Sequence, residues 1–241
     1  MSYSGRVVVV TGGTRGIGRV IAGAFAGEGA QVVVCARTAP ESSPFHFVQA
    51  DLREPDQAAA VIDTTVSTYG RLDVLVNNAG GSPSADAATV SPRFVAKIVA
   101  LNLLAPFYVA QAANAVMQEQ YGGGMIVNIG SVAARQPEPG TAAYAAAKAG
   151  LLTLTRALAL EWAPKVRVNH ITVGLIASFY DPVAADAVSR LIPMGRMAEP
   201  GDVAAACLYL ASPQAAYLTG ADLPVHGGGE LPARYVAAHP D

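Results

Sequence analysis

Short apolar runs alternate with longer, mixed segments along most of the chain. The runs are continuous, with no alternation of apolar and polar positions, as in strands whose two faces are both covered. Regular alternation of such strands with helices is typical of a doubly wound parallel sheet. The pattern therefore predicts an α/β fold with helices on both faces. The expected strands cover 7–10, 32–36, 45–49, 72–76, 125–129, 166–171 and 223–225.

Apolar residues at helical spacing predict helices between these strands. Ser91 and Pro92 are the expected N-cap and first turn of the longest helix, in which Pro106 is expected to introduce a kink. The pattern weakens at about 175–200, beyond a strand's carboxyl end, which favours a substrate lid there. The expected helices follow the first glycine-rich loop as far as 29 and then cover 56–69, 91–120, 142–163, 183–191 and 202–210.

The chain of 241 residues has no linker and no shift in composition, so we expect a single domain over 1–241, with a C-terminal tail at 230–241. Charged residues make up only 14% and the net charge is -2, which argues against nucleic acid or an anionic membrane as a partner. Cys35 and Cys207 lie far apart, with neither metal nor redox spacing. We therefore expect a cytoplasmic protein with no metal site, signal peptide or membrane span.

The first expected strand leads into the sequence TGGTRGIG, which begins at Thr11 and opens a helix. Gly12, Gly16 and Gly18 would allow a tight turn, a close approach of the backbone to a pyrophosphate and close packing of helix on strand. The N–H groups at the start of a helix bind phosphate readily. The loop therefore predicts a dinucleotide-binding site.

The end of the second expected strand indicates which dinucleotide is preferred. A carboxylate often stands there to bind the adenosine ribose, but this chain has Cys35-Ala36-Arg37. Arg37, helped by Arg15 in the glycine loop, could bind a 2′-phosphate through charge-assisted hydrogen bonds. This predicts a preference for NADP(H), with NAD(H) still possible. The alternative is that Arg37 is an ordinary solvated loop residue.

Ser131, Tyr144 and Lys148 are the candidate reactive groups. Tyr144 and Lys148 are four residues apart in an expected helix and so share a face. A neighbouring ammonium would lower the pKa of a phenol and let Tyr144 exchange protons near neutrality. Ser131 follows an apolar strand and could hydrogen-bond an oxygen on which charge develops. The alternative is an exposed Tyr and Lys on a surface helix.

With these motifs in place, the sequence closely resembles the short-chain dehydrogenase/reductase family from residue 6 to about residue 229. The resemblance is carried by TGGTRGIG, by NNAG from Asn77, by Ser131 with YAAAK from Tyr144, and by the segment 169–178. It implies a seven-stranded sheet with the cofactor across its carboxyl edge. It also implies that Tyr144 moves the proton, that Lys148 tunes Tyr144 and holds the nicotinamide ribose, and that Ser131 positions the substrate oxygen. Asn102 would anchor a water leading protons to Lys148.

The same resemblance implies the residues that bind the cofactor. They are Gly12, Thr14, Arg15, Gly16, Ile17 and Gly18 at the pyrophosphate, Arg37, Asp51 and Leu52 at the adenosine, Asn78, Ala79 and Gly80 after the fourth strand, and Tyr144, Lys148, Ile176 and Ser178 at the nicotinamide. The chain departs from the family pattern at two positions. Val173 replaces a usual Pro before Gly174, and His226 replaces a common Asp before the last glycines. We interpret His226 as structural rather than as a proton shuttle.

The expected activity is NADP(H)-linked interconversion of a small or lipid-like ketone and a secondary alcohol. Within enzymes, the alternative is a 3-oxoacyl-thioester reductase that acts on acyl carrier protein. An acidic carrier would favour basic residues near the entrance, yet the long helix ends in Gln118-Glu119-Gln120. An alternative outside enzymes is a dinucleotide-sensing regulator without turnover. Such a protein would not need all of Asn102, Ser131, Tyr144 and Lys148. The resemblance also implies a homo-oligomer, with a tetramer as the family expectation. The 52% hydrophobic content is compatible with a subunit interface.

Overall fold

The computed structural model describes residues 2–232 and 238, and in it the chain forms a seven-stranded sheet in the order β3-β2-β1-β4-β5-β6-β7. Every neighbouring pair of strands in the sheet is parallel. This confirms the predicted doubly wound fold. The strands are β1 (Val7–Thr11), β2 (Gln31–Ala36), β3 (His46–Gln49), β4 (Val74–Asn77), β5 (Gly124–Ile129), β6 (Val166–Val173) and β7 (Asp222–Val225).

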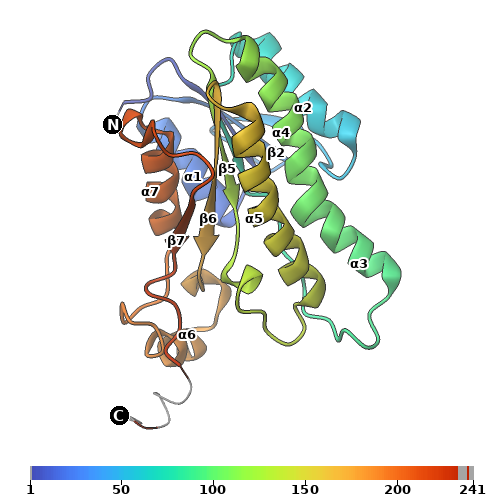
Figure 1. Ribbon diagram of the computed structural model, residues 1–241, viewed down its shortest axis with the longest axis vertical. Coiled ribbons are helices and arrows are strands. Elements are labelled where there is room, and N and C mark those ends of the chain that lie inside the picture. Colours follow the sequence, from blue (N-terminus) through green and yellow to red (C-terminus); the bar gives the residue numbers. More distant parts are fainter. Residues whose placement is uncertain (1, 233–237, 239–241) are drawn as a thin grey trace.

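Helices cover both faces of the sheet, as Figure 1 shows, with α1 and α7 on one face and α2, α4 and α5 on the other. The helix α6 lies by itself beyond the carboxyl ends of β6 and β7. The helices are α1 (Gly16–Gly27), α2 (Pro55–Tyr69), α3 (Pro92–Val99), α4 (Ala105–Glu119), α5 (Ala142–Trp162), α6 (Pro182–Ser189) and α7 (Pro200–Ala211).

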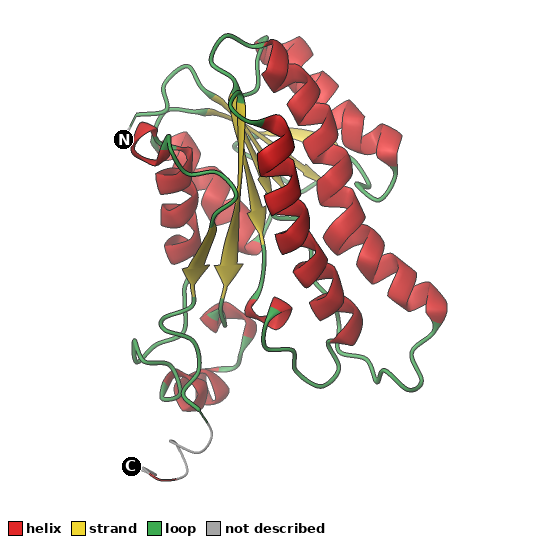
Figure 2. Cartoon of the chain, in the orientation of Figure 1, coloured by secondary structure: helices red, strands yellow, loops and turns green. Residues whose placement is uncertain are grey.

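The continuous apolar strands are buried on both faces because each face meets a different helix layer. In β1, Val8 and Val10 belong to the core beneath α1 and α7, whereas Val9 belongs to the core beneath α2 and α4. All three side chains are fully buried. Burial of each such side chain stabilises the fold by about 1.5–3 kcal/mol. Because all the strands are parallel, their carboxyl ends lie at one edge of the sheet, where the arrowheads in Figure 2 point.

The long helix predicted at 91–120 is divided by a π-helical turn. Ser91 caps α3 by accepting a hydrogen bond from the Phe94 N–H, as expected. A π-helical turn, Ala100–Leu104, then precedes α4, which has Pro106 in its first turn. Proline lacks an N–H and its ring crowds the carbonyl four residues earlier, and a π-turn relieves both problems. The irregularity therefore lies just before Pro106, and it contains the buried Asn102.

Two strand boundaries differ from the prediction for identifiable reasons. Leu72 was expected to start β4, but its backbone N–H and C=O bind the Gln120 side chain at 2.8 Å each, so the strand starts at Val74. The strand β6 continues past Ile171 to Val173, because Val173 pairs with Val225 of β7. Each shift is set by a partner more than 45 residues away.

The segment predicted as a lid contains α6 and a 3-10 turn, Ala177–Phe179. Ile176 forms an isolated parallel bridge with Ala198, so the two ends of the segment are joined. Asp181 caps α6 by accepting hydrogen bonds from the N–H groups of Val183 and Ala184, at 3.1 Å each. Of the predicted tail at 230–241, residues 233–237 and 239–241 lie outside the described residues.

The helical run Pro92–Glu119 is long and apolar enough, by length and composition alone, to cross a membrane. In the fold, however, it packs on the sheet. Its Val109, Ala113 and Met117 are fully buried in the core beneath α2 and α4. The core therefore accounts for part of the apolar character of this run, of whose most apolar window 33% is buried.

Candidate active site

A cleft of about 1290 Å³ opens along the carboxyl edge of the sheet. Single small-molecule sites usually occupy about 300–1,000 Å³, so this cleft has room for a dinucleotide together with a second molecule. The predicted residues that line it are Gly12, Thr14, Arg15, Gly16, Ile17, Gly18, Arg37, Asp51, Leu52, Asn78, Ala79, Gly80, Ser131, Tyr144, Lys148 and Ile176. Asn102 and Ser178 are the predicted residues that do not line it.

The glycine loop has the geometry that a pyrophosphate requires. Gly16 has φ +53°, and a Cβ there would meet nothing within 4 Å, so the start of α1 is open to the cleft. A Cβ on Gly18 would lie 2.4 Å from Asn78 Nδ2 and 2.5 Å from Gly12 O, so only glycine fits at this crossing. Asn78 supports the loop by donating to the Thr11 carbonyl at 2.9 Å.

The start of α1 also carries unused hydrogen-bonding capacity. Its N-cap, Arg15, makes no side-chain capping bond, and its first turn contains no acidic residue. The first N–H groups of a helix have no partner within the helix, and the positive end of the helix dipole favours an anion. This end of the cleft therefore fits the phosphates of a nicotinamide dinucleotide.

Basic side chains gather at the far end of the cleft. Arg15 and Arg37 line it and are exposed. In the part of the chain that the structure describes, neither guanidinium has a hydrogen bond or ion pair. Asp51 is paired with Arg53, and the hydrogen bond from Arg53 lowers the pKa of Asp51 despite partial burial. Asp51, whose pKa the charge of Arg37 also lowers, is thus already paired with another arginine.

Ser131, Tyr144 and Lys148 come together in this cleft, as the sequence predicted. Ser131 follows β5 and caps a short 3-10 turn, Val132–Ala134, by accepting a hydrogen bond from the Ala133 N–H at 3.2 Å. It is also hydrogen-bonded to Tyr144. Lys148 is only 4% exposed, and Tyr144 is half-buried. The alternative of a solvated Tyr and Lys on a surface helix is therefore wrong.

The electrostatics of Tyr144 differ from the prediction. Burial raises the pKa of Tyr144, and the hydrogen bond with Ser131 opposes this only in part. The Lys148 ammonium is directed at the backbone instead, because its Nζ donates to the Ile129 carbonyl at 2.8 Å and lies 5.7 Å from the tyrosine ring centre. Burial in turn lowers the pKa of Lys148 to about 8. The net direction for the pKa of Tyr144 is thus opposite to the one that the helix spacing suggested, and the tuning of Tyr144 by Lys148 stays a prediction.

Asn102 lies beneath the cleft wall. Its Oδ1 accepts from the Gly81 N–H at 2.9 Å, and its Nδ2 donates to the Gly81 and Ile98 carbonyls at 3.0 Å each. A Cβ on Gly80 would lie 2.8 Å from Asn102 Oδ1 and 3.3 Å from Lys148 Nζ, so Gly80 separates these two groups. Asn102 therefore fixes the loop beside Lys148. Its expected role in a water-mediated proton path stays a prediction.

The structure does not bring Ser178 into the cleft. The chain turns into the 3-10 turn Ala177–Phe179 directly after Ile176, and Ser178 is exposed on that turn. Phe179 and Tyr180 line the cleft instead and give it an apolar wall. Thr38 and Gly81 also line it and were not predicted. Gly81 has φ +125°, and the second glycine after NNA was the available signal for it.

The two departures from the family pattern lie side by side at the ends of β6 and β7. Gly174 donates its N–H to the Val225 carbonyl at 2.9 Å, and a Cβ on Gly174 would lie 2.8 Å from the Cα of His226. Val173 thus extends the sheet toward the cleft. The Nδ1 of His226 is buried and has no hydrogen-bond partner among the described residues.

Comparison with known proteins gives consistent matches over nearly the whole chain. The family described as enoyl-(acyl carrier protein) reductase matches residues 12–230. An uncharacterized oxidoreductase of Mycobacterium tuberculosis is 38% identical over 94% of this chain and 93% of its own. The 3beta-hydroxysteroid dehydrogenase 1 of Eggerthella lenta is 37% identical over 94% of each chain.

The fold also matches that of a solved structure along nearly the whole chain. The ligand-free aldohexose dehydrogenase of Thermoplasma acidophilum superposes with a TM-score of 0.88 at 33% identity, covering 92% of this chain and 93% of that one. The chain therefore belongs to the short-chain dehydrogenase/reductase family and is an oxidoreductase of alcohols or carbonyls that uses a nicotinamide cofactor.

Proposed function

We propose that the protein is an NADP(H)-dependent oxidoreductase that interconverts a ketone and a secondary alcohol, with Tyr144 as the general acid and base. The observation that carries the proposal is the convergence of Ser131, Tyr144 and Lys148 on the cleft that also contains the open start of α1. A nicotinamide dinucleotide supplies the hydride chemistry when it is bound. The chain's own residues supply binding, orientation and the proton.

The protein's part of the reaction follows from its hydrogen bonds. Ser131 accepts from Ala133 through its oxygen, so its hydroxyl hydrogen is free to bind Tyr144 or a substrate oxygen. Burial raises the pKa of Tyr144, so its phenol is protonated at neutral pH. A neutral phenol is the form that gives a proton to a developing alkoxide. These properties support carbonyl reduction as the direction favoured at neutral pH.

The preference for NADP(H) is supported by the charges at the end of β2. Arg15 and Arg37 line the cleft there, and the strand ends without a carboxylate that would repel a 2′-phosphate. Asp51 is held by Arg53 and does not neutralise Arg37 directly. A phosphate bound by two guanidinium groups gains charge-assisted hydrogen bonds that a ribose hydroxyl cannot match.

The aromatic side chains of the cleft support an apolar substrate. Phe179 and Tyr180 form an apolar wall of the cleft, which supports a ketone on a small apolar or lipid-like skeleton. Two of the relatives are named as dehydrogenases of a 3beta-hydroxysteroid and of an aldohexose. The matching family, in contrast, is described by an acyl-carrier-protein substrate, so the names alone do not separate a cyclic ketone from an acyl thioester. A panel of cyclic ketones and an acetoacetyl thioester would separate the two readings.

The decisive variant is Tyr144→Phe, measured with NADPH and this panel by following the absorbance of the reduced cofactor. Loss of the phenol removes the proton donor, so turnover is expected to fall by about 10²–10⁴-fold. The dissociation constant for NADPH is expected to stay within about twofold, because the phosphates bind elsewhere. Turnover at the wild-type level in Tyr144→Phe contradicts the proposed mechanism. If the protein binds NADPH tightly but reduces no compound of the panel, the result favours the sensor alternative.

We also propose that the protein is a homo-oligomer, with a tetramer as the family expectation. Large apolar side chains are strongly exposed outside the cleft, among them Leu160 of α5 and Tyr217, at 85% and 102%. Apolar surface of this kind is enriched at the cores of subunit interfaces. Analytical ultracentrifugation at micromolar concentration is expected to show a species larger than the 24.6 kDa monomer. A monomer alone contradicts the proposal.

A further inference from the structure

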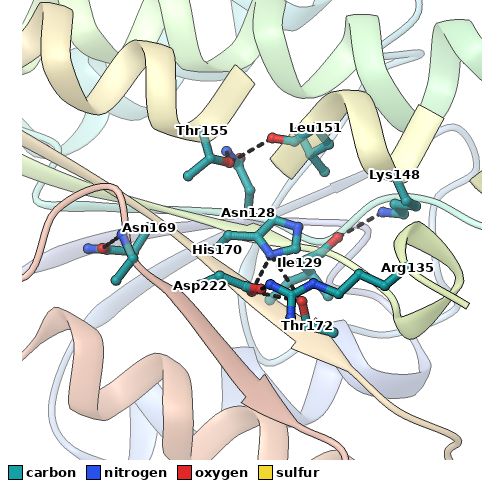
Figure 3. Close-up of polar contacts among 11 residues, drawn as sticks. Asn128, Ile129, Arg135, Lys148, Leu151, Thr155, Asn169, His170, Thr172 and Asp222 are labelled. Carbon is teal, nitrogen blue, oxygen red and sulfur yellow. Dashed lines mark hydrogen bonds and ion pairs between the residues drawn. The ribbon is translucent and has the colours of Figure 1, made fainter. Parts of the chain in front are cut away.

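The buried carboxylate of Asp222, on β7, contacts side chains of β6 and of the segment that follows β5, which contains the reactive serine. It pairs in register with His170 on the neighbouring strand β6. Its Oδ1 lies 2.7 Å from His170 Nδ1 and accepts a hydrogen bond from Thr172 Oγ1 at 2.7 Å. Its Oδ2 accepts from Arg135 Nη2 at 2.6 Å. Figure 3 shows the imidazole and the guanidinium both meeting this one carboxylate.

The His170 ring lies directly against the backbone that leads to Ser131. A Cβ on Gly130 would lie 2.0 Å from His170 Cε1 and 2.1 Å from its Nε2. Gly130 also donates its N–H to the Ile171 carbonyl at 2.8 Å. His170 is fully buried, and its Nε2 has no hydrogen-bond partner among the described residues. The ring is thus held by Asp222 on one side and supports Gly130 on the other.

Arg135 reaches the same carboxylate from the other end of the reactive segment. After Ser131 the chain makes the 3-10 turn Val132–Ala134, and Arg135 closes it by donating its N–H to the Val132 carbonyl at 2.9 Å. The Arg135 side chain is half exposed, whereas that of Asp222 is only 5% exposed. Segment 130–135 is therefore fixed at both ends, through His170 and through Arg135, to one group on β7.

The surroundings of Asp222 keep its carboxyl group ionised. Burial raises the pKa of Asp222, but the hydrogen bonds from His170 and Thr172 and the nearby charge of Arg135 outweigh burial and hold it below its usual value. Burying a carboxylate is costly unless it is fully hydrogen-bonded, and an apolar group of similar size would often serve stability as well. A role of the Asp222 carboxylate in fixing the position of segment 130–135 would explain why a charged group stands at this buried position.

We propose that Asp222, acting through His170 and Arg135, is a positioning residue that sets the Ser131 hydroxyl for the substrate oxygen. None of these three side chains lines the cleft, so they act only through segment 130–135. The inference rests on the proposed carbonyl–alcohol reaction at Ser131 and Tyr144. Misplacement of a positioning group by about 1 Å can cost up to about 10²-fold in rate.

The test variant is Arg135→Met, which removes the outer end of this arrangement at a half-exposed position. We expect kcat at saturating NADPH to fall about tenfold, with the NADPH dissociation constant unchanged within about twofold. Arg135→Lys keeps a cation for Asp222 and is expected to recover kcat to within about threefold of wild type.

A matched control is Arg71→Met. Arg71 pairs with Asp73, a carboxylate whose side chain is 2% exposed, and the Arg71 side chain is 45% exposed, close to the 53% of Arg135. Asp73 immediately precedes β4, at the opposite edge of the sheet from the cleft. Arg71→Met is therefore expected to leave kcat within about twofold of wild type. Wild-type kcat in Arg135→Met, or equal losses in both variants, overturns the proposal.

His170→Asn tests the inner end, because asparagine can still donate to Asp222 but no longer reaches Gly130. We expect a loss of kcat similar to that of Arg135→Met, and a wild-type kcat overturns the role of His170. If the wild-type protein turns over no substrate of the panel, the proposed function fails. Amide hydrogen exchange then still tests whether Asp222 and Arg135 hold segment 130–135 in place. Faster amide exchange over 130–135 in Arg135→Met than in Arg71→Met supports the positioning role, and equal exchange overturns it.

Discussion

Lys148 shows how strongly one side chain's properties depend on its surroundings. Its spacing from Tyr144 suggested an ammonium that tunes a phenol, but its Nζ is directed to the Ile129 carbonyl and is almost completely buried. Burial lowers the pKa of Lys148 to about 8, from its ordinary value of 10.5. Burial of the charged Lys148 ammonium therefore lowers the free energy of unfolding at neutral pH.

This cost predicts a pH dependence of stability. Between about pH 8 and pH 10.5 the unfolded chain binds a proton at Lys148 that the folded chain does not, so folding stability contributed by this site rises with pH. We compare urea unfolding of wild type and Lys148→Met, followed by the fluorescence of Trp162. The free energy of unfolding of wild type relative to the variant is expected to increase by on the order of 2 kcal/mol between pH 7 and pH 10. A difference that is constant with pH contradicts the burial effect.

At the scale of elements, the sequence predicted the order and type of the strands and helices because apolar runs and helical spacing are local signals. It did not predict the π-turn Ala100–Leu104, since a helix and a π-turn have nearly the same pattern of apolar residues. Pro106 pointed to an irregularity, but the backbone relieved it one turn earlier. The displaced turn matters because it carries Asn102 to the loop beside Lys148.

The site was predictable where a residue's role follows from its position at the end of a strand or the start of a helix. Gly16, Arg37 and Ser131 are of this kind, and all three line the cleft. Ser178 was misplaced because a turn, which has no apolar periodicity, decides where its side chain points. The contact of Asp222 with Arg135 joins residues 87 apart, and nothing in the local sequence of either one predicts it.

At the scale of the whole molecule, the cleft connects elements from both halves of the sheet. Its walls come from the glycine loop after β1, the ends of β2 and β4, Ser131 after β5, the start of α5 and the segment after β6. A ligand that bridges these elements binds the folded protein and not the unfolded chain. Its binding free energy therefore adds directly to global stability.

This linkage offers a test of cofactor preference that needs no substrate. At 100 times its dissociation constant, NADPH is expected to stabilise the fold by about 2.7 kcal/mol, which raises the Tm of a chain of this size by about 5–10 °C. Arg37→Ala removes one charge-assisted partner of the 2′-phosphate, worth about 1.5–3 kcal/mol, so about half or more of the NADPH shift should be lost at the same concentration. The shift produced by NADH, which has no 2′-phosphate, should be smaller in wild type and unaffected by Arg37→Ala. Arg190→Met, which removes an exposed arginine that directly follows α6 and pairs with Asp186, is the control and should leave both shifts unchanged. A larger shift with NADH than with NADPH in wild type contradicts the assignment, because the only chemical difference between the two ligands is the phosphate that Arg37 is proposed to bind.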